Sequence, residues 1–452
     1  MRLITMIGIV VIFCDCSAKV MPHLPVECDN KNKKRSTFLW EVRHKKNLKG
    51  PSSFLFGTIH VPYTVIWDWI DPLVMEAFHF ADEIVFELDL NNRKTVKSLN
   101  ECQMLPIGKE IAETLPPWLY SKLKLYLKRV RRSLPDWLDG AQTYREARAD
   151  LLFKQITGNW ERKRAIWVML ALQSLTPAAV QQSGVPLLDL YLAQLAQGHG
   201  KVTRSLERVK EQCRPLNSLH YSHVVYALNQ TISNQERLLD YQSSHPAQQL
   251  LSHYRCGQLD ESVFQEDIVK MNDPTVNAIN LNSYFHKRLI HRRNIRMGKR
   301  TARLIRRNPH TSFFVALGAG HFLGNQSIIQ ILERRGFSVK PIPVSDGPRF
   351  FSRQSNFQHH HMTTYSLSNL PIFANSKHPE KPTSTRRQSP QIQDLWIQIK
   401  SPNPARLPVP TYQSSSSSSA LSSFAPFGDN KFRYNSIWIF IVSVMLNIHY
   451  LV

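Results

Sequence analysis

Two short motifs in this sequence share the pattern Gly-x-x-His, and each follows an apolar run. They are Gly57–His60, after SFLF, and Gly318–His321, after SFFVAL. A histidine after a strand can bind a metal ion or transfer a proton, and a nearby glycine lets a ligand or another backbone approach closely. One such histidine is more often a simple hydrogen-bonding residue. Two matching placements favour a functional site.

Two glutamates are further candidates for the same site. Glu87 lies in EIVFELDL, residues 83–90, where most of its neighbours are apolar. A carboxylate in a buried strand is unfavourable unless it is paired or bound to a cation, and Asp89 would point to the same face of the strand. The alternative is that Glu87 caps a neighbouring element. Glu207, in RSLERVKEQ, is a weaker candidate because the helix dipole usually explains a glutamate near a helix start.

Common hydrolase motifs are missing from the sequence, since neither His-Glu-x-x-His nor Gly-x-Ser-x-Gly occurs. This excludes a standard zincin and a serine hydrolase of the nucleophile-elbow type. Imidazole and carboxylate donors without thiolate suit harder metals such as manganese. A metal ion held by them can lower the pKa of a bound water, with one carboxylate as general base. The ligand and base roles of Glu87 remain open.

The elements that carry these residues predict an α/β fold. A strand at 53–60, a helix at 71–81 and a strand at 83–90 form one βαβ-like unit. A strand at 312–321, a helix at 325–335 and a final strand after residue 336 form a second. Each unit presents Gly-x-x-His at the carboxyl end of its first strand, where open α/β sheets bind ligands. We therefore expect a distant duplication whose two motifs face a shared crevice.

The chain between the two units, 111–307, has apolar residues at helical spacing and predicts a long, mainly helical insertion. One short strand is expected within it, at 201–206. The folded domain then runs from 47 to 344. Before it, residues 20–46 are polar and basic, and we interpret them as a lead-in to the first strand.

Both ends of the sequence have the composition of targeting segments. Residues 1–19 have the layout of a cleavable secretory signal. Residues 345–435 are rich in Ser, Pro, Gln and His and predict a disordered stalk. The uncharged tail 436–452 is long enough for a tight single-pass anchor or a glycolipid-anchor signal. Either places the body outside the cell, as a single-pass type I protein of the cell membrane or as a GPI-anchored one.

Four cysteines remain after the predicted signal, which suggests two disulfides in an oxidising compartment. Their pairing is open among three connectivities; they are Cys28, Cys102, Cys213 and Cys256. Two glycosylation sequons begin at Asn229 and Asn325. The second is the less favoured acceptor, because its closeness to His321 suggests burial.

The formal net charge of +23 would normally suggest a nucleic-acid partner, but export argues against one. Ten basic residues occur without an acid between Lys287 and Arg307, and a second basic run extends from Lys122 to Arg132. These runs have two interpretations. They are solvated helix faces, or they attract anionic glycans or lipid head groups outside the cell.

Five segments in this order resemble the TraB/PrgY superfamily: FGTIH, FELD, Leu206-Glu207 followed by Gln212, the pair Arg293-Asn294, and GAGHFLG. The signal, the stretch WIDPLVMEAFHFADEIVFELDL and the hydrophobic tail resemble the TIKI metalloproteases of animals within that superfamily. The resemblance covers about residues 37–344. It departs from the superfamily pattern in reading Ser-Leu-Glu-Arg at the middle motif and Arg292 before the Arg-Asn pair.

The resemblance implies a membrane-tethered protease, active with Mn²⁺ or Co²⁺, that cleaves the N-terminal region of Wnt proteins and negatively regulates Wnt signalling. It implies that His60, Glu87 and His321 are the catalytic and metal-linked residues, joined less securely by Glu207 as a metal ligand. The alternative is a non-catalytic, metal-containing surface protein that binds and sequesters a signalling ligand. Retention of all three residues favours the enzyme.

Overall fold

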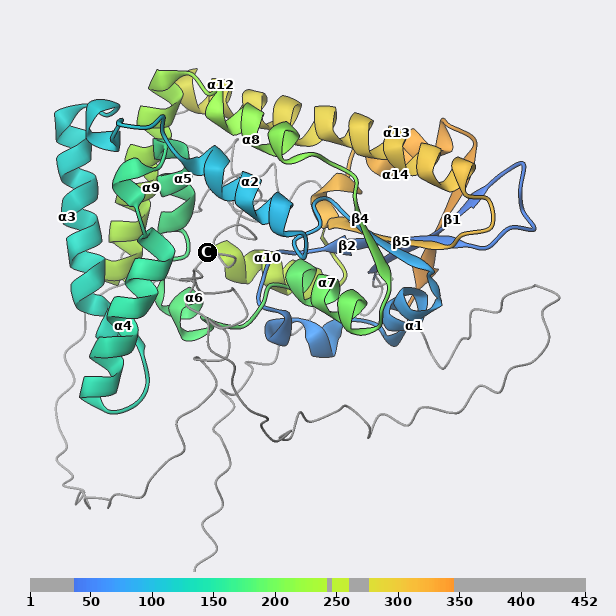
Figure 1. The fold of residues 1–452 in the computed structure, drawn as a ribbon, viewed down its shortest axis with the longest axis horizontal. Helices are drawn as coiled ribbons and strands as arrows, with labels where there is room; N and C mark the ends of the chain where they lie inside the picture. The colour runs from blue at the N-terminus through green and yellow to red at the C-terminus, as the bar shows by residue number, and fades with distance from the viewer. Residues whose placement is uncertain (1–35, 242–245, 260–275, 345–452) are drawn as a thin grey trace, which may run out of the picture.

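The computed structural model describes residues 36–241, 246–259 and 276–344 of the chain, and its centre is a six-stranded mixed sheet. The strands lie in the order β4-β3-β5-β2-β1-β6, and Figure 1 shows the sheet at one end of the molecule. Their bounds are β1 Ser36–His44, β2 Ser53–Thr58, β3 Glu83–Phe86, β4 Val202–Ser205, β5 Phe313–Gly318 and β6 Phe337–Pro343. The α/β fold class and the short strand near residue 203 are therefore as predicted.

Four neighbouring strands, β4, β3, β5 and β2, are parallel to one another. The two predicted strand-helix-strand units are present, but their strands interleave rather than pair within each unit. Strand β5 of the second unit lies between β2 and β3 of the first. Strand β6 lies at the far edge and pairs antiparallel with β1. The apolar runs predicted each strand, whereas the strand order depends on contacts distant in sequence.

Strand β1 was not predicted as a separate element, because its sequence STFLWEVRH mixes polar and apolar residues. It lies inside the segment that we interpreted as a lead-in, and it pairs antiparallel with both β2 and β6. The pairing with β6 shifts register between Ser36 and Trp40. This strand thus joins the start of the described chain to its end.

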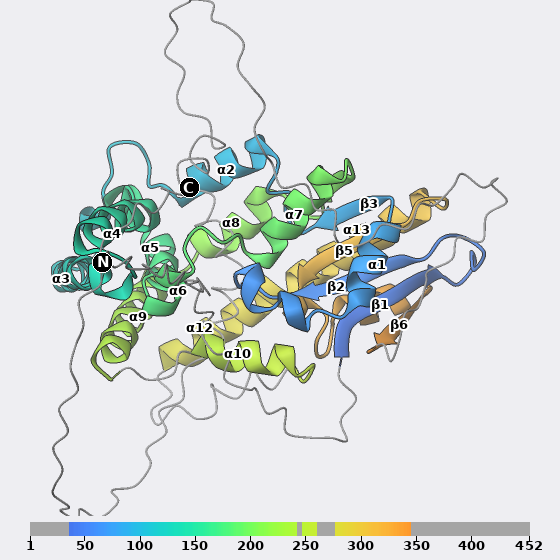
Figure 2. The ribbon, with the colours of Figure 1, turned by 90° about the horizontal axis from the view of Figure 1, so that it is seen from below.

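Helices cover both faces of the sheet and build a separate lobe beside it (Figure 2). Alternate residues of the inner strands point to the two faces. On one face they pack with α1, α7 and α10, and on the other with α13 and α14. The helices of these two layers are α1 Pro72–Phe80, α7 Leu188–Gly198, α10 Pro246–Arg255, α13 Arg292–Arg307 and α14 Ile328–Glu333.

The lobe confirms the predicted helical middle region and has its own apolar core. A disulfide between Cys102 and Cys213 joins α2 to α8 within it. Cys28 lies outside the described residues. The remaining helices are α2 Arg93–Gln103, α3 Pro117–Ser133, α4 Gln142–Thr157, α5 Ala165–Leu172, α6 Pro177–Gln181, α8 Val209–Asn217, α9 Tyr221–Tyr241 and α12 Val276–Phe285, which continues through a π-helical segment, His286–His291, into α13.

The predicted signal, stalk and hydrophobic tail lie outside the described residues and stay predictions. Among the helices that the structure describes, none combines the length and the apolar character needed to cross a membrane.

Candidate functional site

The candidate site lies at the carboxyl ends of the four parallel strands. Thr58 is opposite Gly318 in the pairing of β2 with β5, and Phe86 is opposite Ala316 in the pairing of β3 with β5. The ends of these strands therefore meet at one edge of the sheet. Each strand is followed within three residues by one that the sequence singled out: Glu207 after β4, Glu87 after β3, His321 after β5 and His60 after β2.

Three of these side chains converge on the α carbon of Gly318. A Cβ atom placed there would lie 3.4 Å from Oε1 of Glu87, 3.7 Å from Cδ2 of His321 and 3.8 Å from Nε2 of His60. These are the three heavy atoms nearest to that position. The amide of Gly318 also donates a hydrogen bond of 3.0 Å to Oε1 of Glu87. Glycine thus leaves a space open between the predicted catalytic residues.

The imidazole of His60 is oriented by Asp189 at the start of α7. Its Nδ1 lies 2.6 Å from Oδ2 of Asp189, whose Oδ1 accepts a 2.6 Å hydrogen bond from Thr58. The amide of Leu188 donates to the carbonyl of Val61, which ties α7 to the chain just after His60. Burial lowers the pKa of His60, but the charge and hydrogen bond of Asp189 outweigh burial and raise it overall.

Asp189 was not among the predicted site residues. One signal was present in the sequence, because it is the single acid in the apolar run LLDLYLAQLA and its side chain is buried. An acid in the first turn of a helix is usually explained by the helix dipole. Its role in orienting His60 becomes visible only in the fold, because the two residues are 129 positions apart in the sequence.

The imidazole of His321 is oriented in the same way by Asn294 on α13. Its Nδ1 lies 2.6 Å from Oδ1 of Asn294, while Nδ2 of that amide donates to the carbonyl of Gln326 at 3.1 Å. The second bond fixes which end of the amide faces the ring, so Nδ1 of His321 carries the proton. Its Nε2 lies 3.4 Å from Oε1 of Glu87.

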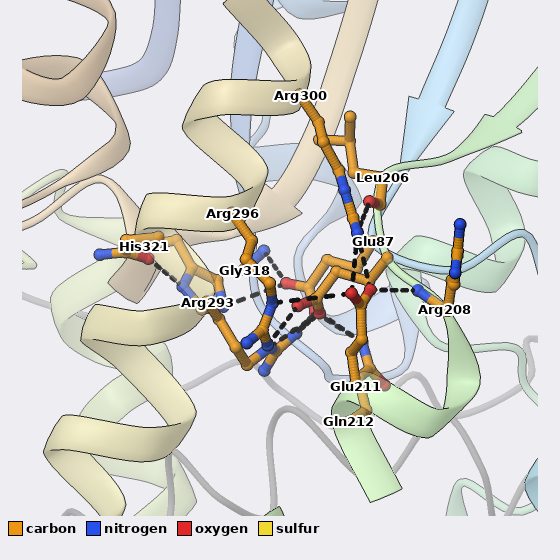
Figure 3. Close-up of polar contacts among 12 residues, drawn as sticks. Glu87, Leu206, Arg208, Glu211, Gln212, Arg293, Arg296, Arg300, Gly318 and His321 are labelled. Atoms are coloured by element: carbon orange, nitrogen blue, oxygen red, sulfur yellow. Dashed lines mark hydrogen bonds and ion pairs between the residues drawn. The ribbon is translucent and has the colours of Figure 1, made fainter. Parts of the chain in front are cut away.

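A single buried arginine, Arg293, pairs with both Glu87 and Glu207; Figure 3 labels it together with Glu87. Arg293 is fully buried on α13 and donates to Oε2 of Glu87 and, from Nε at 2.8 Å, to Oε2 of Glu207. Gln212 donates to both carboxylates, at 3.3 and 3.1 Å. Burial raises the pKa of Glu87, but Arg293, with His321 and His60, holds it well below its usual range. Glu87 is therefore ionised whenever the protein is folded near neutral pH.

Glu207 has a different position from the other three predicted residues. Its side chain is fully buried, and its oxygens accept from Arg293, Gln212 and, at 3.4 Å, Arg296. These donors occupy both oxygens. Glu207 therefore holds Arg293 in place, and its role as a metal ligand stays a prediction. Its backbone amide also donates to the carbonyl of Glu87 at 2.9 Å, which extends the pairing of β3 with β4.

The side chains of His60, His321 and Glu87 are of the kinds that bind metal ions, and part of their spacing also suits one. Two ligands at about 2.1 Å from one tetrahedral ion lie about 3.4 Å apart, and Nε2 of His321 lies 3.4 Å from Oε1 of Glu87. Both histidines also have their Nδ1 held by an oxygen, as metal-bound histidines usually do. Within the described part of the chain, no group of three or more His, Cys, Asp or Glu side chains could hold a metal ion. A metal site made of His60, His321 and Glu87 would therefore need these side chains to move closer together.

The remaining predicted residues lie away from this centre. Asp89 accepts a 2.7 Å hydrogen bond from Thr203 and is not part of the cluster. Asn229 lies on α9, where its Oδ1 accepts from Lys122 at 2.9 Å. Asn325 is exposed, against the expectation that closeness to His321 would bury it. Glycosylation at both sequons stays a prediction.

Comparisons with known proteins identify the family of this chain. The model of the TraB/PrgY/gumN family matches residues 38–341. Metalloprotease TIKI2 of Danio rerio is 38% identical over 416 residues, which are 82% of this chain and 80% of that protein. Metalloprotease TIKI1 of Homo sapiens is 40% identical over 320 residues, 68% of this chain and 62% of that protein. No solved structure matches. This chain therefore belongs to the TraB/PrgY/gumN family and is a homologue of the TIKI metalloproteases.

Proposed function

We propose that this chain is a metal-dependent protease that cleaves the N-terminal region of Wnt proteins and so inhibits Wnt signalling. One observation carries the enzymatic part of this proposal: the side chains of His60, Glu87 and His321 meet at the open side of Gly318. The names of the homologous metalloproteases support the reaction class. The Wnt substrate rests on the resemblance to the TIKI family.

Three residues would hold the metal: Nε2 of His60, Nε2 of His321 and Oε1 of Glu87. A divalent cation bound there, Mn²⁺ or Co²⁺ by resemblance, would polarise the scissile carbonyl and acidify a water molecule. The protein supplies orientation. Asp189 and Asn294 hold the protons on the Nδ1 atoms, so each imidazole presents Nε2 to the open space. Fixed tautomers of this kind strengthen metal binding.

The surroundings of Glu87 favour the role of ligand over that of general base. Its Oε2 accepts from Arg293 and Gln212, while Oε1 accepts from the amide of Gly318. Arg293, together with His321 and His60, outweighs burial and holds the pKa of Glu87 well below its usual range, whereas an efficient general base has a pKa near the working pH. We therefore propose Glu87 as an anionic ligand whose charge Arg293 partly balances.

The proposed setting is the outer face of the cell membrane. The predicted signal 1–19 and tail 436–452 support a tethered body, as a type I single-pass protein or through a glycolipid. The disulfide between Cys102 and Cys213 agrees with an oxidising compartment. No nucleic acid is expected as a partner.

The test is direct cleavage. The full chain, purified and supplied with Mn²⁺, would be incubated with a purified Wnt protein, and the loss of an N-terminal peptide followed by mass spectrometry. We expect His60→Ala and His321→Ala to abolish cleavage. His310→Ala is the matched control, since this histidine is exposed and far from the cluster in the fold.

Two outcomes decide against the proposal. Wild-type cleavage rates in both site variants would remove the histidines from the mechanism. Inhibition of signalling by a wild-type chain that never cleaves the Wnt protein would favour the binding and sequestering alternative.

A further inference from the structure

Helix α3 forms the outer edge of the helical lobe, at the end of the molecule away from the sheet (Figure 1 and Figure 2). One side of this 17-residue helix packs into the lobe. Its buried residues are Leu119, Leu123, Tyr126, Leu127 and Val130. The opposite side faces solvent, and its composition is unusual for a solvated helix face.

Two large apolar side chains lie on that opposite side. Trp118 is 54% exposed and Leu125 is 68% exposed. They are seven residues apart, so at 3.6 residues per turn they point in directions about 20° apart. Trp118 and Leu125 therefore form a short exposed apolar strip along the helix.

Three basic residues border the strip. Lys124, Lys128 and Arg132 are exposed and spaced four residues apart, which places them on neighbouring turns of one side. Within the described part of the chain no carboxylate pairs with any of them, whereas Arg129 pairs with Asp240. The whole helix has six basic residues and no acid. We name Trp118, Leu125 and these three residues the α3 basic face.

We propose that the α3 basic face docks onto an anionic lipid surface. Lysine and arginine bordering exposed tryptophan and leucine are typical of helices that lie in a membrane interface. A sulfated glycan would be recognised by the charges alone and would leave Trp118 and Leu125 without a role. The face extends from Trp118 to Arg132, about 21 Å at 1.5 Å per residue, which suits contact along a flat surface. The proposal does not depend on proteolytic activity.

The basic residues and the apolar strip should contribute separately to the affinity for an anionic bilayer. Each basic residue near an anionic bilayer strengthens binding about fivefold, so three give about 100-fold. Salt screens this part within about 10 Å at 0.1 M. The apolar strip adds a contribution that salt leaves in place.

The experiment measures which lysines the lipid covers. The full chain would be incorporated into vesicles of phosphatidylcholine, with or without phosphatidylglycerol, and treated with an amine-acetylating reagent. Mass spectrometry then gives the labelling rate at each lysine. We expect Lys124 and Lys128 to react about tenfold more slowly on anionic vesicles, with recovery at high salt. Lys97 on α2, whose side chain is 80% exposed, is the internal reference.

A matched pair of variants tests the apolar strip. Trp118→Ser with Leu125→Ser should reduce the protection, while Ile107→Ser, which alters a residue 98% exposed outside α3, should leave it unchanged. Equal labelling on both kinds of vesicle would overturn the proposal. So would unchanged protection in the double variant, or protection by soluble heparin but not by vesicles, which would assign the face to a glycan.

Discussion

Replacing Gly318 with alanine should separate the site from the fold. The backbone of Gly318 has φ −52°, which alanine adopts without strain. The added methyl group would lie at 3.4 to 3.8 Å from its nearest neighbours, which is ordinary van der Waals contact. Those neighbours are Glu87, His321 and His60, so the methyl group would occupy the space that they share.

Gly318→Ala should have a small effect on stability and a large effect on activity. For stability, loss of glycine's flexibility in the unfolded chain should stabilise the folded protein by about 0.4–1 kcal/mol, because the new contacts introduce no strain. The melting temperature should therefore change by no more than about 4 °C. For activity, the methyl group would displace whatever binds between the three side chains, and a displacement of about 1 Å among reacting groups can lower the rate about 100-fold. We expect a folded Gly318→Ala protein with cleavage reduced at least about 100-fold.

Gly57→Ala provides the matched comparison. Its Cβ would lie 3.2 Å from both Cα and Cβ of Ala319, so neighbouring backbone must shift. Overpacking of this kind costs about 1–3 kcal/mol. Thermal unfolding, Mn²⁺ titration by calorimetry and the Wnt cleavage assay would be run on both variants. Full activity and unchanged Mn²⁺ affinity in Gly318→Ala would refute the reasoning that this space is the reaction centre.

Three further predictions follow from the contacts of the site. Asp189→Asn weakens the group that orients His60, so Mn²⁺ affinity measured by calorimetry should fall about 10- to 100-fold; an unchanged affinity would contradict the orienting role. Arg293→Ala removes the buried cation that Glu87 and Glu207 share, so chemical denaturation should show a loss of about 3–5 kcal/mol in the free energy of unfolding; a loss below about 1 kcal/mol would contradict a buried ion pair. Arg300 lowers the pKa of Glu211 from 4.5 to about 2, so the native state binds this proton less readily than the unfolded chain. The stabilisation is present above pH 4.5 and lost as the pH falls toward 2, and the melting-temperature gap between wild type and Glu211→Gln should shrink over that window. A melting-temperature difference that does not change with pH would contradict the stabilising ion pair of Glu211 with Arg300.

Local patterns in the sequence predicted the elements of the site. The apolar runs around Phe56, Phe86 and Phe314 each predicted a strand, and the residues after those runs predicted a shared crevice. This succeeded because strands buried on both faces are apolar throughout, and because parallel strands end at one edge. Glu87 was visible for the same reason, as a charge inside an apolar run.

Contacts between distant segments could not be predicted in this way. The position of β5 between β2 and β3 follows from packing of the assembled sheet and leaves no local signal. Asp189 has the appearance of an ordinary helix-start acid until α7 is placed beside His60. Arg293 stood out only through the family resemblance, because in a helix with many basic residues its sequence neighbours do not distinguish the buried arginine from the exposed ones.

The interleaved strand order has a consequence for biosynthesis. Strand β5, Phe313–Gly318, is the neighbour of both β2 and β3, yet more than 220 residues separate it from either. On the ribosome, β2 and β3 emerge long before β5, the strand that joins them, and such non-local pairing is slow and exposes unpaired edges. We expect nascent chains arrested before residue 313 to be digested readily by added protease, and completed chains to resist. The proposed site at Gly318 would then be completed only when the last strands arrive, after the rest of the domain has been translated.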